Sequence, residues 1–214
     1  MGIEKLINCV NVGKQYNNKN IISNINLTLL NHKLYVLVGP NGSGKSTLMK
    51  IISGIIDPTI GNVIVSDSVT VSYVSDDIKL YEYLTGQEHI NFFEYMNGFK
   101  MNNQIKKLII DLNFEPFLDI VTKNYSKGTL QKLRFILGLF TNPKLLLLDE
   151  PLDGLDPNSI KVVRDFIDYF VKKEGSVIYA TRIMNNDLQF DELLTLNFYR
   201  ENLDQLYKEE KKHV

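Results

Sequence analysis

The densest group of chemically useful residues in the sequence is a glycine-rich loop at positions 39–46. Its residues are Gly39, Pro40, Asn41, Gly42, Ser43, Gly44, Lys45 and Ser46. They match the pattern G-x-x-x-x-G-K-[ST] at every fixed position. Glycines let backbone N–H groups turn inward around an anion, and a helix that follows directs its positive end at the same point. The loop therefore predicts a site for nucleotide phosphates.

Three side chains of this loop region have distinct predicted tasks. Lys45 can reach the β- and γ-phosphates, the Ser46 hydroxyl can bind Mg²⁺, and Thr47 can contact the α-phosphate. A chance glycine-rich turn is the alternative, but an apolar run at 34–38 precedes the loop and an apolar-periodic segment at 48–52 follows it. This motif alone leaves GTPases, kinases and motor ATPases open.

A second acidic site follows four consecutive leucines at 145–148. Asp149 and Glu150 come directly after this run. A buried strand that ends in aspartate beside a phosphate loop is the usual place for the carboxylate that holds Mg²⁺. We expect Asp149 to take that role, through a bound water, and Glu150 to act as the general base on the attacking water. Two exposed acids at a strand end are the alternative, and the phosphate loop favours the functional interpretation.

The surrounding sequence predicts the elements that position these residues. Strands are expected at 25–29, 34–38, 145–148 and 177–180, helices at 48–52, 130–140 and 160–170, and a hairpin from 63–65 and 69–74. Residues 85–124 change to a helical pattern, with Ile90, Phe93 and Met96 on one face. The alternation of strands and helices predicts an α/β fold with a mostly parallel sheet.

The domain prediction is a single nucleotide-binding domain over 1–214. Its core is expected at about 1–84 and 142–198, with an antiparallel β subdomain near the N-terminus. A helical insertion is expected at about 85–141 and a C-terminal tail at 199–214.

Charge, cysteine content and hydropathy indicate which classes of function and which cell compartments are disfavoured. The net charge is −1, so nothing favours nucleic-acid binding. The one cysteine, Cys9, gives no sign of an oxidising compartment, and the start lacks the features of a signal peptide. No apolar stretch approaches the roughly 20 residues that span a bilayer. We therefore expect a cytoplasmic protein whose membrane partner, if any, is another polypeptide.

Further motifs, together with the loop and the acids, resemble an ATP-binding-cassette (ABC) nucleotide-binding domain. The family signature corresponds to Tyr125 followed by Ser126, Lys127, Gly128 and Thr129, just before the acidic strand. The segment 151–157, which holds Gly154, Leu155 and Asp156, resembles the family's D-loop. Tyr16 resembles the aromatic residue that stacks on adenine, although it could be an ordinary tyrosine. Segments 73–77 and 80–85 resemble the link between core and helical subdomain.

The resemblance implies a mechanism. Two such domains pack head to tail, as a homodimer or heterodimer, and each ATP with its Mg²⁺ lies between one chain's phosphate loop and the other chain's signature. Ser126 and the Gly128 N–H then contact the γ-phosphate in trans, and hydrolysis opens the dimer to drive a membrane-spanning permease subunit that docks beside Asp76. Ser126 can also cap the following helix. The protein is then peripheral on the inner face of the membrane.

Two positions depart from the family pattern. The family usually has glutamine where Asp76 stands, a side chain that contacts Mg²⁺ and senses the γ-phosphate. Arg182 stands where the family has histidine. Arginine stays cationic and only donates hydrogen bonds, so it can either grip the γ-phosphate or turn outward. The hypothesis is that ATP binding is intact and that hydrolysis is slow or depends on a partner.

Three functions compete on this basis. The first is a transport ATPase with separate membrane subunits, and the Tyr-Ser-Lys-Gly form of the signature resembles bacterial exporters of drugs, peptides or bacteriocins. The second is a non-transport ABC protein in translation or iron–sulfur assembly. The third is a catalytically weak regulatory subunit paired with a more active homologue.

Overall fold

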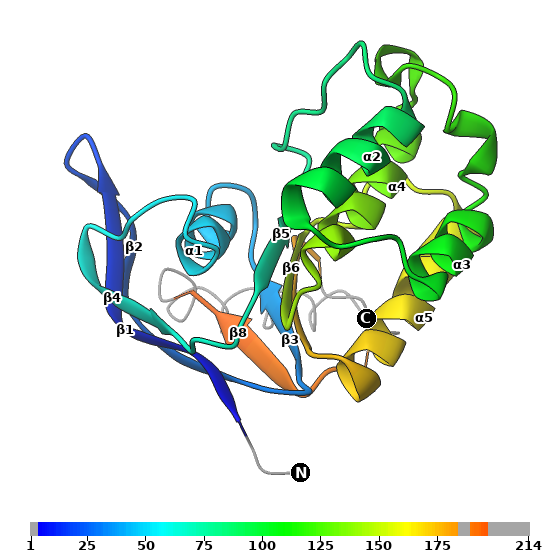
Figure 1. Ribbon diagram of the computed structural model, residues 1–214. Coiled ribbons are helices and arrows are strands. Elements are labelled where there is room, and N and C mark those ends of the chain that lie inside the picture. The colour runs from blue at the N-terminus through cyan, green and yellow to red at the C-terminus, as the bar shows by residue number, and fades with distance from the viewer. Residues whose placement is uncertain (1–3, 184–188, 197–214) are drawn as a thin grey trace, which may run out of the picture.

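A computed structural model describes residues 4–183 and 189–196 of the 214-residue chain. Five parallel strands form the main sheet in the order β5-β6-β7-β3-β8. Their bounds are β3 Leu34–Val38, β5 Val71–Val74, β6 Leu145–Asp149, β7 Ser176–Thr181 and β8 Glu192–Thr195. Three antiparallel strands form a second sheet in the order β2-β1-β4, with β1 Lys5–Tyr16, β2 Lys19–Leu30 and β4 Ile60–Val65 (Figure 1).

The leucine run of β6 explains why the parallel sheet has two cores. Leu145 and Leu147 pack into one hydrophobic cluster with α1 (Lys45–Ile52) and the antiparallel sheet. Leu146 and Leu148 pack into the other, with helices of the opposite face. Successive side chains of a strand point to opposite faces, so a strand covered on both sides must be apolar throughout. The predicted α/β class with a parallel sheet is confirmed.

The antiparallel sheet stands beside α1 and contributes the second wall of that core. Cys9 and Val12 of β1 and Leu29 of β2 are buried there. Asn17 and Asn18 join β1 to β2 with φ of 48° and 61°. Both central residues of this two-residue turn are left-handed, which matches the right-handed twist of a hairpin.

The predicted hairpin from 63–65 and 69–74 is wrong. β4 pairs with β1, with Ile7 opposite Val65, whereas β5 pairs in parallel with β6, with Val74 opposite Leu148. The turn between them carries the chain from one sheet to the other. The burial pattern differs accordingly, because β4 is partly or fully exposed along its length while most of β5 is buried.

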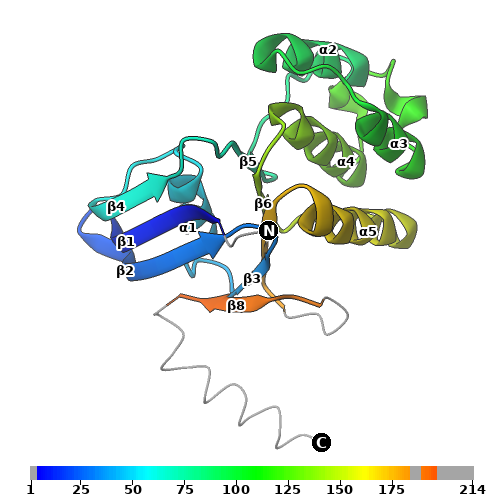
Figure 2. The same cartoon turned by 60° about the horizontal axis from the view of Figure 1, so that its bottom comes forward.

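Three helices, α2 Gly86–Asn97, α3 Asn103–Asp111 and α4 Lys127–Gly138, form the predicted helical subdomain beside β5 and β6 (Figures 1 and 2). Thr85 and Glu88 form a reciprocal capping box at the start of α2, and Gly98 ends it with a φ of 62°. Ile90 is buried as expected, but Met96 is 63% exposed, so it does not share the buried face.

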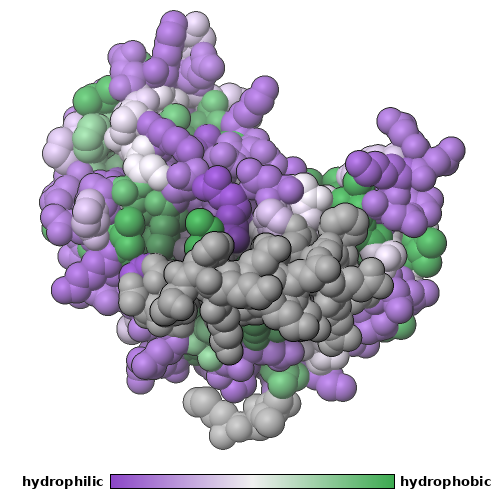
Figure 3. Space-filling view, turned by 180° about the vertical axis from the view of Figure 1, so that it is seen from behind, coloured by the Kyte–Doolittle hydropathy of each residue, from purple (hydrophilic) through white to green (hydrophobic). Residues whose placement is uncertain are grey.

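The remaining helix, α5 Pro157–Lys173, packs on β7, and 3₁₀ turns lie at Glu115–Phe117, Thr122–Asn124 and Leu139–Thr141. Among the described residues, no helix has the length and apolar character needed to cross a membrane. Seen from the side opposite Figure 1, the coloured surface is largely hydrophilic, with small hydrophobic groups between (Figure 3). The expected tail at 199–214 lies outside the described residues.

Candidate functional site

The glycine-rich loop leaves β3 and ends where α1 begins at Lys45. The Gly39 N–H donates to the carbonyl of Thr181 at 3.2 Å, which ties the loop to the end of β7. Gly44 has a φ of +97°, and a Cβ there would lie 2.4 Å from Cγ2 of Ile22. Only glycine fits both the left-handed backbone and this close approach. The loop is therefore held in a tight curve around the helix N-terminus.

Lys45 points its ammonium group back over the loop. Its Nζ donates to the carbonyls of Gly39 at 2.5 Å and Pro40 at 3.2 Å, and the residue is 5% exposed. Burial lowers the pKa of Lys45, while the nearby Glu150 and Asp149 oppose that shift. The hydroxyl of Ser43 is buried and has no hydrogen-bond partner among the described residues. Buried polar atoms nearly always find a partner, so this hydroxyl is suited to a bound ligand.

The acids after β6 lie opposite the loop. Asp149 is 6% exposed and accepts a hydrogen bond from the hydroxyl of Tyr73 at 3.0 Å. Glu150 has a φ of 48°, and its N–H donates to the carbonyl of Ala180 at 3.0 Å. A left-handed glutamate is uncommon, and this backbone turn directs the chain away from the strand. Burial raises the pKa of Glu150, and Arg182 and Lys45 oppose that rise.

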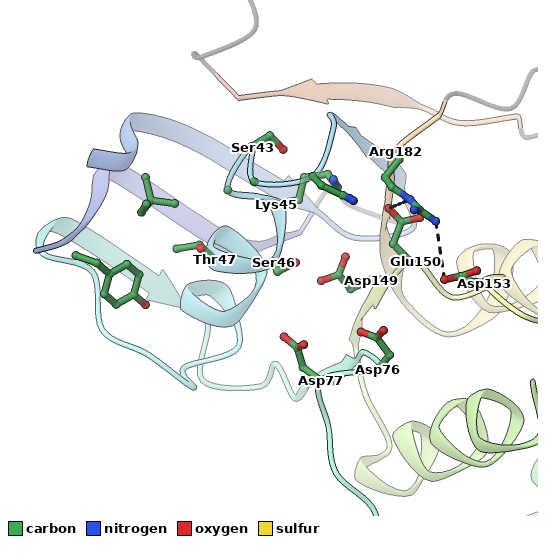
Figure 4. A pocket seen from close by; sticks show the side chains of 15 residues that line it. Ser43, Lys45, Ser46, Thr47, Asp76, Asp77, Asp149, Glu150, Asp153 and Arg182 are labelled. Atoms are coloured by element: carbon green, nitrogen blue, oxygen red, sulfur yellow. Dashed lines mark ion pairs between the residues drawn. The ribbon is translucent and has the colours of Figure 1, made fainter. Parts of the chain in front are cut away.

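Arg182 follows β7 and lies against Glu150. Its Nε is 3.3 Å from Oε1 of Glu150, and its Nη2 is 3.8 Å from Oδ2 of Asp153 (Figure 4). The Arg182 side chain thus faces the carboxylates instead of solvent alone. The sequence identified Arg182 but not Asp153, whose position in the D-loop segment gives no direct sign of this contact.

These groups line one cavity of about 490 Å³, which is within the range of small-ligand sites. Figure 4 shows Lys45, Asp149 and Glu150 facing the same space, with Asp76 and Asp77 on its other side. The lining comprises Tyr16, Ile21, Asn41, Gly42, Ser43, Gly44, Lys45, Ser46, Thr47, Asp76, Asp77, Asp149, Glu150, Asp153 and Arg182. Gly39 and Pro40 are not part of this lining, and their carbonyls accept hydrogen bonds from Lys45.

Tyr16 is the last residue of β1, and it lines the same cavity as the glycine-rich loop. The residue is 47% exposed, and the ammonium of Lys14 lies 5.2 Å from its ring centroid. One cation on an aromatic ring leaves the ring accessible to a flat partner. Besides Asp153, the lining residues that the sequence analysis missed are Ile21 and Asp77, which carry no motif of their own.

The oxygen atoms at the acidic side suit Mg²⁺. Ser46, Asp149 and Asp76 line the same cavity, and hydroxyl and carboxylate oxygens are the ligands this ion prefers. Mg²⁺ keeps several waters and binds to nucleotide phosphates through one or two protein groups. The donor set of this cavity therefore fits a nucleotide-bound Mg²⁺.

The signature residues do not line this cavity. Ser126 caps α4, because its Oγ accepts from the Thr129 N–H at 3.1 Å. Gly128 contacts the D-loop, and a Cβ on it would lie 2.4 Å from the carbonyl of Gly154. Lys127 pairs with Asp153 at 2.6 Å. The signature is thus in contact with its own D-loop and separate from its own phosphate loop.

Asp156, at the end of the D-loop segment, makes contacts that should stabilise the folded protein. Its carboxylate caps α5 by accepting from the Ser159 N–H at 2.9 Å, and it pairs with Lys132 at 3.1 Å. Hydrogen bonds from Ser159, with help from Lys132, hold the pKa of Asp156 well below its usual range. We predict that Asp156→Ala costs about 1–2 kcal/mol. Thermal unfolding should show a Tm about 2–8 °C lower.

The control for this prediction is Asp156→Asn, which keeps an oxygen acceptor for the Ser159 N–H. Its Tm should fall less than that of Asp156→Ala. Equal Tm values for Asp156→Ala and the wild type would contradict the capping role.

Comparisons with known proteins agree with this geometry. The family model described as "ABC transporter" matches residues 22–153, more than half of the chain. The chain is 32% identical over 182 residues to the lantibiotic transport ATP-binding protein SrtF of Streptococcus pyogenes, covering 82% of this chain and 79% of that protein. It is also 32% identical to the zinc import ATP-binding protein ZnuC of Wigglesworthia glossinidia brevipalpis, covering 91% and 84%.

Solved structures share the fold. A structure described as the ATP-binding subunit of an ABC transporter superposes with a TM-score of 0.80 at 23% identity, covering 95% of this chain and 98% of that one. A putative ABC transporter ATP-binding protein from Pyrococcus furiosus gives a TM-score of 0.76 at 22% identity, covering 92% and 99%. The family match, the relatives and the fold agree, and the chain belongs to the ABC transporter family of ATP-binding proteins.

Proposed function

We propose that this chain binds ATP with Mg²⁺ in the cavity of about 490 Å³ and hydrolyses it to power transport through separate membrane-spanning subunits. The observation that carries the proposal is the meeting of a buried lysine, a loop of backbone N–H groups and two carboxylates around one space. Lys45 is far in the sequence from the neighbouring Asp149 and Glu150, and all three line the cavity.

Each residue has a defined task in this proposal. Lys45 and the N–H groups of the loop bind the phosphates, while Ser46, Asp149 and Asp76 supply oxygens for the metal. When bound, Mg²⁺ neutralises charge on the phosphate oxygens. Glu150 accepts a proton from the attacking water, since it lines the cavity beside Lys45 and Asp149. Tyr16 stacks on the adenine and Thr47 contacts the α-phosphate.

The complete site requires a second chain. Ser126, Lys127, Gly128 and Thr129 lie outside the cavity that their own chain forms. A head-to-tail dimer would place this signature on the ATP of the partner, where the Gly128 N–H and the start of α4 face the γ-phosphate. The partner is a second copy or a homologous subunit. This arrangement is supported by the separation of the two motifs in one chain.

The direction of transport that we propose is export. The Tyr-Ser-Lys-Gly signature resembles exporter subunits, and one relative is named for lantibiotic transport, although another is named for zinc import. The permease would dock beside Asp76, which places the ATPase at the inner face of the cell membrane. Co-purification from cells should then recover a protein with membrane spans. Recovery of ribosomes instead would favour a role in translation.

Arg182 is the reason to expect a low basal rate. Its Nε lies 3.3 Å from Oε1 of Glu150, so the proposed base is paired with a cation in this structure. We predict that Arg182→His raises the basal ATPase rate about two- to fivefold, the range expected from breaking a partly exposed ion pair. A phosphate-release assay on the purified protein measures this. A fast wild-type rate that stays unchanged in Arg182→His would refute the idea.

A second candidate is a regulatory subunit that binds ATP and pairs with a more active homologue. The pairing of Arg182 with Glu150 and the presence of Asp76 where the family has glutamine favour it. Co-purification of a second, non-identical ATP-binding chain would support this candidate over a homodimer.

A further inference from the structure

A single carboxylate oxygen of Asp153 pairs with two positively charged side chains. Its Oδ2 is 2.6 Å from Nζ of Lys127 and 3.8 Å from Nη2 of Arg182. Lys127 belongs to the signature at the start of α4, whereas Arg182 follows β7 at the nucleotide cavity. Figure 4 shows the pair of Asp153 with Arg182, and the pair with Lys127 connects the same carboxylate to the signature of this chain.

Arg182 joins this oxygen to the proposed base. Nε and Nη2 lie on the same planar guanidinium, so they can serve two carboxylates at once. Nε faces Oε1 of Glu150 at 3.3 Å while Nη2 faces Asp153. That Oε1 atom has no hydrogen bond within the described part of the chain, and Arg182 acts more strongly than Lys45 in lowering the pKa of Glu150. Asp153 and Glu150 together determine where the guanidinium lies.

Lys127 competes with Arg182 for Asp153. The lysine stem packs over Gly154, since a Cβ on that glycine would lie 3.3 Å from Cγ and Cδ of Lys127. This packing delivers Nζ to Oδ2 at a direct hydrogen-bond distance, while Arg182 stays 1.2 Å farther away by the difference between 3.8 Å and 2.6 Å. Lys127 and Arg182 both lower the pKa of Asp153, consistent with a carboxylate shared between them.

We propose that Asp153 is a positioning residue for hydrolysis. Its carboxylate keeps Arg182 paired with Glu150, and Lys127 weakens this effect because it pairs with the same carboxylate oxygen. The proposal rests on the function proposed for Glu150 above. Loss of Asp153 would leave Arg182 anchored by Glu150 alone and make the base easier to release. Loss of Lys127 would free Oδ2 to draw closer to Nη2 and fix Arg182 more firmly.

The experiment compares two variants that break the same ion pair. Asp153→Asn should raise the basal ATPase kcat about two- to fivefold, and Lys127→Met should lower it by a similar factor, because the two act oppositely on Arg182. The KM for ATP should change little in Asp153→Asn. Both variants break the Lys127–Asp153 pair that joins α4 to the D-loop. If that pair mattered only as a structural link, kcat would change in the same direction in both variants, and this result would overturn the proposal.

Two further measurements make the result specific. In an Arg182→His background, Asp153→Asn should no longer change kcat, whereas persistence of its effect would overturn a route through Arg182. Asp153→Glu should restore a wild-type kcat, since it keeps the carboxylate. Lys100→Met, which breaks the exposed pair with Glu94, is the control for lost surface charge.

Failure of the proposed function would look different. Hydrolysis in wild type that survives in Glu150→Gln would mean that Glu150 is not the base, whatever the Asp153 variants do. Loss of hydrolysis in Glu150→Gln with no opposite shift between Asp153→Asn and Lys127→Met would leave the base in place and overturn only the role of Asp153.

Discussion

Lys45→Ala should lose at least about 100-fold in ATP hydrolysis and about tenfold in ATP affinity. Lys45 is the buried cation at the centre of the loop, and its Nζ now donates to the carbonyls of Gly39 and Pro40. Alanine removes both the charge that faces the outer phosphates and the links that hold the loop closed. Isothermal titration with ATP and a phosphate-release assay would measure the two losses separately.

The matched control is Lys144→Ala. Lys144 also donates to a backbone carbonyl, that of Glu174 at 3.4 Å, but it lies away from the cavity. Its ATP affinity and rate should stay within about twofold of wild type. An unchanged affinity in Lys45→Ala would contradict the assignment of this loop as the phosphate site.

Glu150→Gln should bind ATP with near wild-type affinity and hydrolyse it about 10²- to 10⁴-fold more slowly, the range typical of a lost general base. Glutamine keeps the size of the side chain but cannot accept a proton from water. The backbone turn at Glu150 is held by its N–H to Ala180, which the substitution leaves in place. Single-turnover hydrolysis and ATP titration together test both halves of this prediction.

Glu174→Gln serves as the control for Glu150→Gln. Burial raises the pKa of Glu174 as it does for Glu150, yet Glu174 lies outside the cavity. Its rate should match wild type. Under the proposed dimer, Glu150→Gln with ATP and Mg²⁺ should also elute as a dimer in size-exclusion chromatography and return to monomer when EDTA removes the metal. A monomer under all conditions would count against the sandwich arrangement.

The elements that carry the chemistry could be predicted because local pattern and burial agree there. The leucine run at β6 is apolar without interruption since its two faces meet two cores, and the loop at 39–46 has glycines where the backbone is left-handed. The convergence of Lys45, Asp149 and Glu150 followed from parallel strands, whose carboxyl ends meet at one edge. These predictions required no knowledge of which strands are neighbours.

Pairing between distant segments was harder to predict. Asp67 and Ser68 separate β4 from β5 and resemble a turn, which favoured a hairpin. β4 instead pairs with β1, which is distant in the sequence. β1 itself escaped prediction, because the bulges and polar residues in 5–16 interrupt its alternation. The contacts of Asp153 with Lys127 and Arg182 could not be predicted either, because they depend on how α4 packs against the loop after β6.

The contact between Gly128 and Gly154 has a mechanical consequence. Gly128 leaves no room for a side chain between the two backbones, because a Cβ on it would lie 2.4 Å from the Gly154 carbonyl oxygen. The start of α4 therefore rests directly on the D-loop, while α2 and α3 lie farther out in the helical subdomain (Figure 2). If the helical subdomain rotates against the core, this close backbone contact is the expected pivot, and the outer helices would then move farther than the start of α4.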